Sequence, residues 1–312
     1  MLYPNSIERF VLDGVSHGVK YWQDIFDFSR STMDSTTAVW HGVMAECARS
    51  PRCAFRQGND TTSSLLERYE RIEARLRDYP ISAVLPDTVP GMVSLSSLRS
   101  ARFRLLYNPA RWPAFLEALA DLEQGKAERM YRDFGLYTSP EFLEPPHRAD
   151  KFLHRAPPSR GVPTPAISCP DADDAYDPRV EKRVDELLHF VEETMPVSVT
   201  AGDWSMWTQF CQRWPVRARE RYTGPFSVKD GLTPPRTPIL FLSNRHDPVT
   251  PLTAAEAIST ALGQNASIVI TEGYGHCSYH NPARCTEERV QHYFETGEIE
   301  AGICAQEIDI FA

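Results

Sequence analysis

The sequence predicts a mixed α/β protein: the carboxyl-terminal part of a parallel sheet with a large, mainly helical insertion. Continuous apolar runs at residues 239–242 and 268–270 indicate two buried strands, and residues 252–263 between them form a short helical pattern. Strand, helix and strand in this order form a right-handed crossover in a parallel sheet. The third observation is a long central region in which apolar residues recur at helical spacing.

The remaining elements follow in chain order. The opening IERFVL predicts a short buried strand that ends at a turn formed by Asp13 and Gly14. Two amphipathic helices are expected at 63–78 and 178–195, and a last one at 286–297. The apolar faces expected for the first two are Leu65, Tyr69, Ile72 and Leu76, and Val180, Val184, Leu187 and Val191. Residues 143–178 are rich in Pro and Ser and predict irregular surface structure.

Composition limits the classes of partner. The 33 basic and 42 acidic residues give a net charge of -9, which provides no electrostatic basis for binding nucleic acid or an anionic membrane. No apolar run reaches the roughly 20 residues that span a bilayer, and the first residues lack the pattern of a signal peptide. We therefore expect neither a nucleic-acid nor a membrane partner.

The compartment is left open by the cysteines. The chain has seven of them, and the pairs Cys47/Cys53 and Cys285/Cys304 have spacings that suit disulfides. Glycosylation sequons begin at Asn59 and Asn265, which matter only in a secreted protein. The cysteines and sequons indicate a secreted ancestor, but the first residues lack the pattern of a signal peptide. The localisation therefore stays unknown.

Two ionisable residues follow the two predicted carboxyl-terminal strands. Asp247 comes after the first strand and His276 after the second, preceded by Gly273 and Gly275, which allow a sharp turn. Each alone has an ordinary interpretation as a solvated or capping loop residue. Together they have the acid-then-base order of a hydrolase triad, in which the carboxylate orients the imidazole. We predict that both are catalytic.

Metal and cofactor sites are not predicted. The run HCSYH places His276, Cys277 and His280 close together, but zinc sites need three or four ligands and no second cluster lies at a suitable spacing. The acidic residues 171–177 lack the central Gly and closing Glu of a calcium loop. A solvated turn is the expected structure there.

Gly14, Ser16 and Gly18 match the G-x-S-x-G spacing of a nucleophile elbow. Ser16 is nevertheless a poor nucleophile candidate, because only 15 residues precede it and they leave no room for a separate oxyanion-hole loop. The residues after Gly18 are also bulkier than an elbow helix requires. We expect Ser16 to lie in a turn that leaves the first strand.

The segment 236–306 resembles the tripeptidyl-aminopeptidase-like branch of the α/β-hydrolases, which includes relatives of prolyl aminopeptidase. The resemblance rests on Asp247 to Pro251, Gly273 to Cys277, Tyr293-Phe294, Cys285 and Cys304. It implies that Asp247 and His276 are the triad acid and base, that Cys285 pairs with Cys304, and that Cys277 is a free thiol. More weakly, it implies further pairs Cys47/Cys53 and Cys169/Cys211.

The same resemblance implies three parts: a core strand fragment at 1–20, a helical lid at 21–230 and the carboxyl-terminal hydrolase core at 231–312. Residues 1–15 resemble the family segment that follows the nucleophile helix. The resemblance therefore implies a truncated serine hydrolase with a small-molecule or peptide substrate, whose nucleophile lies outside the chain. We expect no esterase activity from the chain alone. The alternative is a catalytically inactive binding or interaction module. In either case the uncovered edge of the first strand favours self-association.

Overall fold

A computed structural model of the protein describes residues 3–86, 88, 90–135, 163–172, 180–212, 214 and 216–312. The chain forms two compact units. Unit 1 contains Met1–Trp40, Leu106–Asn108 and Thr164–Asp309, and unit 2 contains His41–Leu105, Pro109–Pro163 and Ile310–Ala312. The division places both of the residues predicted to be catalytic in unit 1.

The sheet of unit 1 has four strands in the order β1-β4-β5-β6, and every neighbouring pair is parallel. The strands are β1 (Val11–Asp13), β4 (Ile239–His246), β5 (Ala266–Tyr274) and β6 (Gly302–Cys304). The expected strand–helix–strand crossover is confirmed, because α12 (Leu252–Leu262) connects the parallel strands β4 and β5. The predicted α/β class is therefore confirmed.

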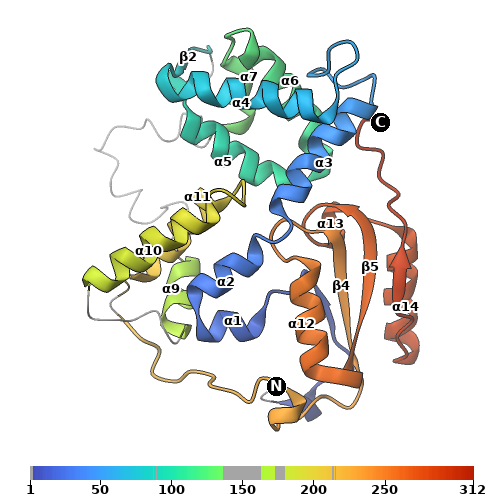
Figure 1. Ribbon diagram of the computed structural model, residues 1–312. Coiled ribbons are helices and arrows are strands. Elements are labelled where there is room, and N and C mark those ends of the chain that lie inside the picture. The colour runs from blue at the N-terminus through green and yellow to red at the C-terminus, as the bar shows by residue number, and fades with distance from the viewer. Residues whose placement is uncertain are drawn as a thin grey trace. The chain divides into compact units, whose positions relative to one another are not determined.

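Helices cover both faces of this sheet (Figure 1). On one face Phe241 of β4 packs with Ala255 of α12 in a buried apolar cluster. On the other face Leu240 and Leu242 pack with Tyr293 of α14 (Arg284–Thr296). The continuous apolar run of β4 is explained by this burial on both faces.

Tyr293 also ties α14 to the sheet. Its buried hydroxyl donates a 2.7 Å hydrogen bond to the carbonyl oxygen of Pro238 and accepts a 2.9 Å bond from the backbone N–H of Phe10. These two bonds join α14 to the residues just before β1 and β4. Tyr293 therefore anchors α14 at the amino ends of these two strands.

The remaining helices of unit 1 are mostly short. They are α1 (Gly18–Gln23), α2 (Ile25–Thr32), α9 (Pro163–Asp171), α10 (Val180–Thr194), α11 (Ala201–Gln212) and α13 (Cys277–His280). Helix α3 (Thr36–Arg49) begins in unit 1 and ends in unit 2.

Unit 2 contains the helices α4 (Thr62–Asp78), α5 (Leu95–Leu106, whose last residue is assigned to unit 1), α6 (Trp112–Glu123) and α7 (Glu128–Phe134). It also contains a short antiparallel pair, β2 (Ile81–Ala83) and β3 (Gly91–Val93), which the sequence pattern did not predict. The expected apolar face of α4 is confirmed, since its members are all buried: Leu65, Tyr69, Ile72 and Leu76.

Two sequence expectations need correction. In α10, Val184 is 43% exposed, whereas Phe190 is fully buried and packs against Phe26. Leu187 and Val191 of the expected row are half-buried, and the side chain of Val180 lies outside the described residues. Within the described part of this helix, the buried positions are Phe190 and Thr194. Residues 163–171, expected to be irregular, form α9, because its first prolines lie in the first turn, where backbone N–H groups need no helical partner. Residues 143–162 and 173–178 of that stretch, which include most of the acidic run, lie outside the described residues.

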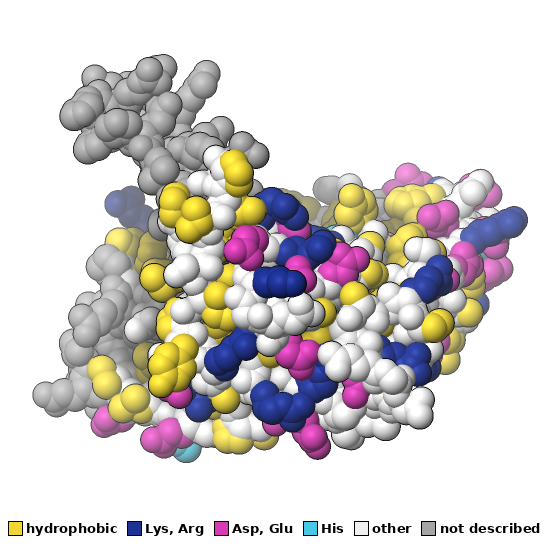
Figure 2. Space-filling view, turned by 90° about the horizontal axis from the view of Figure 1, so that it is seen from above, with side chains coloured by type: hydrophobic (Ala, Val, Ile, Leu, Met, Phe, Trp, Pro, Cys, Tyr) yellow, Lys and Arg dark blue, Asp and Glu magenta, His cyan; other side chains and the backbone are white. Residues whose placement is uncertain are grey.

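Disulfides join Cys47 to Cys53, Cys169 to Cys211 and Cys285 to Cys304, and Cys277 is a free thiol. All three expected pairs are confirmed. Within the described part of the chain, no helix combines the length and the apolar character needed to cross a bilayer. Basic and acidic side chains are interspersed on the face shown in Figure 2.

Candidate functional site

Asp247 is the first residue after β4 and is fully buried. One of its carboxylate oxygens accepts hydrogen bonds from the backbone N–H groups of Val249 and Thr250, both at 2.8 Å, and the other accepts from the Thr250 hydroxyl at 3.0 Å. An aspartate that bonds to the backbone two and three residues ahead forms an Asx turn. The sequence Asp-Pro-Val-Thr therefore fixes this carboxylate by local bonds.

His276 follows β5 through a sharp change of direction. Gly273 and Gly275 have φ values of +107° and +122°, which glycine adopts readily. A Cβ atom on Gly273 would also lie 2.5 Å from the side chain of Gln306. The backbone N–H of His276 donates a 2.9 Å bond to the carbonyl oxygen of Tyr107. The glycine-rich approach predicted from the sequence is thus present.

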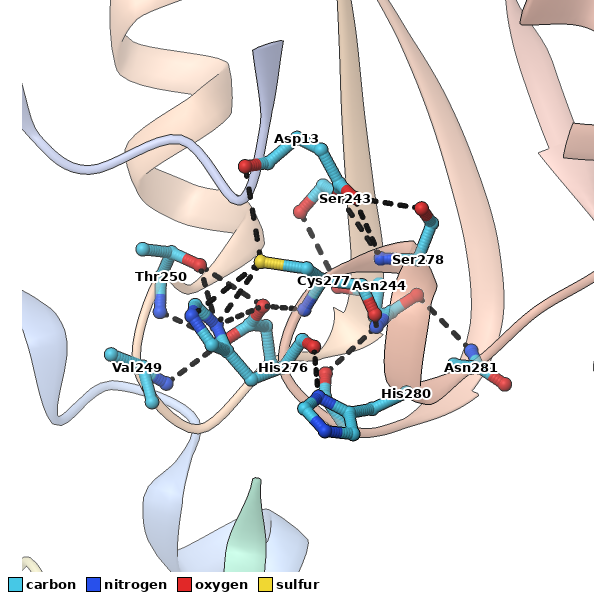
Figure 3. Close-up of polar contacts among 12 residues, drawn as sticks. Asp13, Ser243, Asn244, Val249, Thr250, His276, Cys277, Ser278, His280 and Asn281 are labelled. Atoms are coloured by element: carbon cyan, nitrogen blue, oxygen red, sulfur yellow. Dashed lines mark hydrogen bonds and ion pairs between the residues drawn. The ribbon is translucent and has the colours of Figure 1, made fainter. Parts of the chain in front are cut away.

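The structure brings the two side chains together, and Figure 3 shows His276 with Thr250 and Cys277 beside it. His276 Nδ1 lies 3.1 Å from each carboxylate oxygen of Asp247, and the Thr250 hydroxyl lies 3.3 Å from the same nitrogen. The imidazole side chain is 24% exposed, whereas the carboxylate is completely buried. A carboxylate in this position accepts the Nδ1–H and leaves Nε2 as the proton acceptor.

Tyr107 forms one wall beside the imidazole. Its ring meets the His276 ring edge-on, with 5.2 Å between the centroids. Burial, followed by the negative charges of Asp247 and Asp203, raises the pKa of the Tyr107 hydroxyl to about 12. The phenol is therefore neutral over the physiological pH range. Nothing in the local sequence around Tyr107 indicated its place beside the imidazole.

Cys277 lies directly after His276, with a positive φ of 62°. Its backbone N–H donates a 2.9 Å bond to Asp247, and its sulfur lies 3.5 Å from both nitrogens of the His276 ring. Burial, followed by the charges of Asp13 and Asp247, raises the pKa of its thiol to about 12. The thiol is therefore protonated near neutral pH and is a weak nucleophile.

Two buried amides support the loop that carries His276. The Asn244 side chain donates to the carbonyl oxygens of Gly275, at 2.7 Å, and Cys277, at 2.8 Å. Asn281 donates to the Asn244 side-chain oxygen at 3.1 Å and to the Glu272 carbonyl at 2.9 Å. Sequence reasoning missed both residues. The signal for Asn244 was its place two residues after the apolar run of β4, in a strand that the sequence predicts to be buried.

Ser16 lies in the turn between β1 and α1 and is exposed. A nucleophile elbow holds its serine in a strained turn. Among the described non-glycine residues, however, the positive φ belongs to Cys277 and not to Ser16. Within the same residues, the polar contacts of the His276 ring are with Asp247, Thr250 and Cys277.

Asp247, His276 and Cys277 also bring three potential metal ligands within 4.8 Å of one another. The donor set does not fit a metal ion, because both Asp247 oxygens already accept bonds from backbone N–H groups. His280 is directed elsewhere, with its Nδ1 2.9 Å from the carbonyl oxygen of His276. The cluster is better described as a hydrogen-bonded acid–base pair with an adjacent thiol.

Residues 197–304 match the family model described as TAP-like protein. This segment is similar to the TAP-like α/β-hydrolases. It covers about a third of the chain and includes α11, β4 and β5, together with Asp247, His276 and Cys277. The resemblance inferred from the sequence is confirmed at this level. We found no curated protein that matches the chain.

Proposed function

We propose that unit 1 carries the acid and the base of a serine-type hydrolase, which cleaves peptide bonds or the ester or amide bonds of small molecules by acyl transfer. The contact between the buried Asp247 carboxylate and His276 Nδ1 carries the proposal. The similarity of residues 197–304 to the TAP-like family supports it. So does the position of both residues at the carboxyl ends of adjacent parallel strands, where α/β proteins bind ligands.

In this reaction His276 Nε2 removes the proton of the attacking hydroxyl and later donates it to the leaving group. Asp247 keeps Nδ1 protonated and stabilises the imidazolium as it forms. The carboxylate is fixed in advance by its bonds from Val249, Thr250 and Cys277, so it needs no reorganisation during the reaction. Asp247→Asn is expected to lower kcat by about 10⁴-fold, because the amide stabilises the wrong imidazole tautomer.

The nucleophile is proposed to lie outside the described residues of this chain. Ser16 lacks the backbone conformation of an elbow serine. The Thr250 hydroxyl lies at Nδ1, on the carboxylate side of the ring. The Cys277 thiol, with its pKa raised to about 12, is a poor substitute.

An active-site phosphonate probe tests this proposal. The natural protein, captured from its source with an antibody against residues 1–312, is treated with a fluorophosphonate and the modified residue is located by mass spectrometry. We expect modification of a serine other than Ser16, and none in the 312-residue chain produced alone. His276→Ala is expected to abolish labelling in the natural protein, whereas the matched His189→Ala, at an exposed position on α10, is expected to leave it unchanged.

Two results would contradict the proposal. Labelling of the isolated chain that disappears in Ser16→Ala would overturn the assignment of the nucleophile. Absence of both labelling and ester or peptide hydrolysis in the natural protein would overturn the hydrolase itself and favour a binding or interaction module.

A further inference from the structure

Asp13, the last residue of β1, contacts the two residues that follow His276 (Figure 3). Its carboxylate oxygens lie 3.0 and 3.1 Å from the backbone nitrogen of Ser278 and accept its N–H. One of them also accepts the Ser278 hydroxyl at 2.7 Å. The Asp13 carbonyl oxygen lies 3.8 Å from the Cys277 sulfur. Asp13 thus binds both residues that follow His276.

The two aspartates hold consecutive backbone N–H groups. Asp247 accepts from the N–H of Cys277, and Asp13 accepts from the N–H of Ser278. Between them Cys277 adopts its positive φ of 62°, a conformation that costs a non-glycine residue roughly 1–2 kcal/mol. Such a conformation persists only where the surroundings over-determine it. Hydrogen bonds from N–H groups to carboxylates are among the stronger ones in proteins.

Gly14 completes this contact. Its φ is +71°, and a Cβ atom there would lie 2.4 Å from the Cys277 sulfur and 3.4 Å from Cε1 of His276. The Cys277 sulfur therefore occupies the space that a side chain at position 14 would need, and the His276 ring borders that space.

We propose that Asp13 is a positioning residue, which holds the backbone at Ser278 and, together with Asp247, fixes His276 for proton transfer. The catalytic meaning of this assignment rests on the proposed hydrolase function. The hydrogen bonds themselves, and the effect of the Asp13 charge on the neighbouring thiol, are testable without any substrate.

The first measurement is hydrogen exchange of the segment 274–281 in the full chain with its disulfides intact. In Asp13→Ala the exchange of the Cys277 and Ser278 amides is expected to accelerate by about tenfold or more, since opening no longer breaks a bond to a carboxylate. Asp13→Asn is expected to accelerate it less, because the amide oxygen still accepts from Ser278. The matched control is Asp24→Asn, which changes an aspartate that caps α2 elsewhere in unit 1.

The second measurement uses Cys277 as a reporter, because the other six cysteines are in disulfides. The charge of Asp13 contributes to the raised pKa of this thiol. Asp13→Asn is therefore expected to increase the rate of alkylation by iodoacetamide at pH 8 by at least about threefold. The increase is expected to shrink in high salt, which screens a charge effect but not a change of access.

Unchanged hydrogen exchange of residues 277 and 278 in Asp13→Ala would overturn the proposal. An alkylation rate in Asp13→Asn that equals the wild-type rate, or an increase that high salt does not reduce, would also overturn it. Asp13→Asn keeps an oxygen that accepts from Ser278, so this second measurement remains possible where Asp13→Ala does not fold. In the natural protein, Asp13→Ala is expected to lower kcat with little change in KM. Failure of the phosphonate test, with exchange and alkylation as expected, would reject the hydrolase and leave the structural role of Asp13 intact.

Discussion

Cys277 contacts the proposed acid Asp247, the proposed base His276 and the end of strand β1. Its N–H bonds to Asp247, its sulfur lies against the His276 ring, and its sulfur also lies near the carbonyl oxygen of Asp13. The cost of its positive φ is offset by these contacts and by those of the next residue. The chemistry of this corner therefore depends on residues far apart in the sequence.

Gly14→Ala tests how tightly this corner is packed. The new methyl group would lie 2.4 Å from the Cys277 sulfur, in a backbone conformation that alanine disfavours, so we expect a loss of about 3 kcal/mol in the free energy of unfolding. In Gly14→Ala combined with Cys277→Ala the sulfur is absent, and about 1–2 kcal/mol of this loss should be recovered. Urea unfolding of the four proteins of this double-mutant cycle gives the values.

Gly231→Ala is the matched control for backbone conformation. Gly231 has a φ of +99° in unit 1, and a Cβ atom there would meet nothing within 4 Å. The free energy of unfolding of Gly231→Ala should be only about 1 kcal/mol lower than that of the wild type. A loss in Gly14→Ala no larger than in Gly231→Ala, or no recovery in the double variant, would contradict close packing of Gly14 on Cys277.

The residues that sequence reasoning found and missed at the site differ in a physical respect. Asp247 and His276 were predictable, because each lies a few residues after an apolar run and their side chains have a well-known shared chemistry. Asp13, Asn244 and Tyr107 act mainly through hydrogen bonds to the backbone of other segments. Such bonds place no pattern in the local sequence, so only the fold reveals them.

At the scale of elements, periodicity predicted the helices whose burial is regular. All four expected apolar residues of α4 are buried, including Leu65 and Leu76. In α10 the expected Val184 is exposed and Phe190 is buried, because the large ring of Phe190 packs against Phe26. The short strands β2, β3 and β6 escaped prediction, since three residues are too few to show an alternation.

Helices α4 and α5 are joined by a carboxylate network centred on Glu73. Arg99 donates two hydrogen bonds to it, at 3.1 and 2.9 Å, and Arg102 and Tyr69 each donate one, at 3.1 and 3.0 Å. Burial alone would raise the pKa of Glu73, but the bonds from Arg99 and the charge of Arg102 outweigh it, and the pKa is lowered. The ionised form is therefore the one that stabilises unit 2.

Glu73→Gln is expected to destabilise unit 2 by about 3 kcal/mol at pH 7, because the largely buried Arg102 and its neighbour Arg99 lose an ionised hydrogen-bond acceptor. A lowered folded-state pKa contributes stability that is present above the unfolded-state pKa and lost as the pH falls through the folded value. The difference between the wild type and Glu73→Gln should therefore shrink from pH 6 towards pH 3. Thermal unfolding across this range measures it, with Glu70→Gln, at an exposed position on α4, as the control. A difference that is constant with pH would contradict the role assigned to the charge.

At the scale of the whole molecule, the chain passes repeatedly between its two units. Unit 1 is built from three separate stretches of sequence, of which Leu106–Asn108 supplies Tyr107 to the site. The class of the sheet was predictable, because its central strands are continuous apolar runs. The division into units was not, because contacts between distant segments define it.

We expect the two units to unfold as separate cooperative transitions, since each has its own buried core and its own disulfides. In calorimetry of the full chain, Gly14→Ala should lower the midpoint of one transition and Glu73→Gln that of the other. The double variant should show both shifts with little interaction between them, because the two positions share no partner. A single transition that both substitutions lower together would mean that the units fold as one, and hydrogen exchange of α4 and β4 in each single variant would then show the same change in both elements.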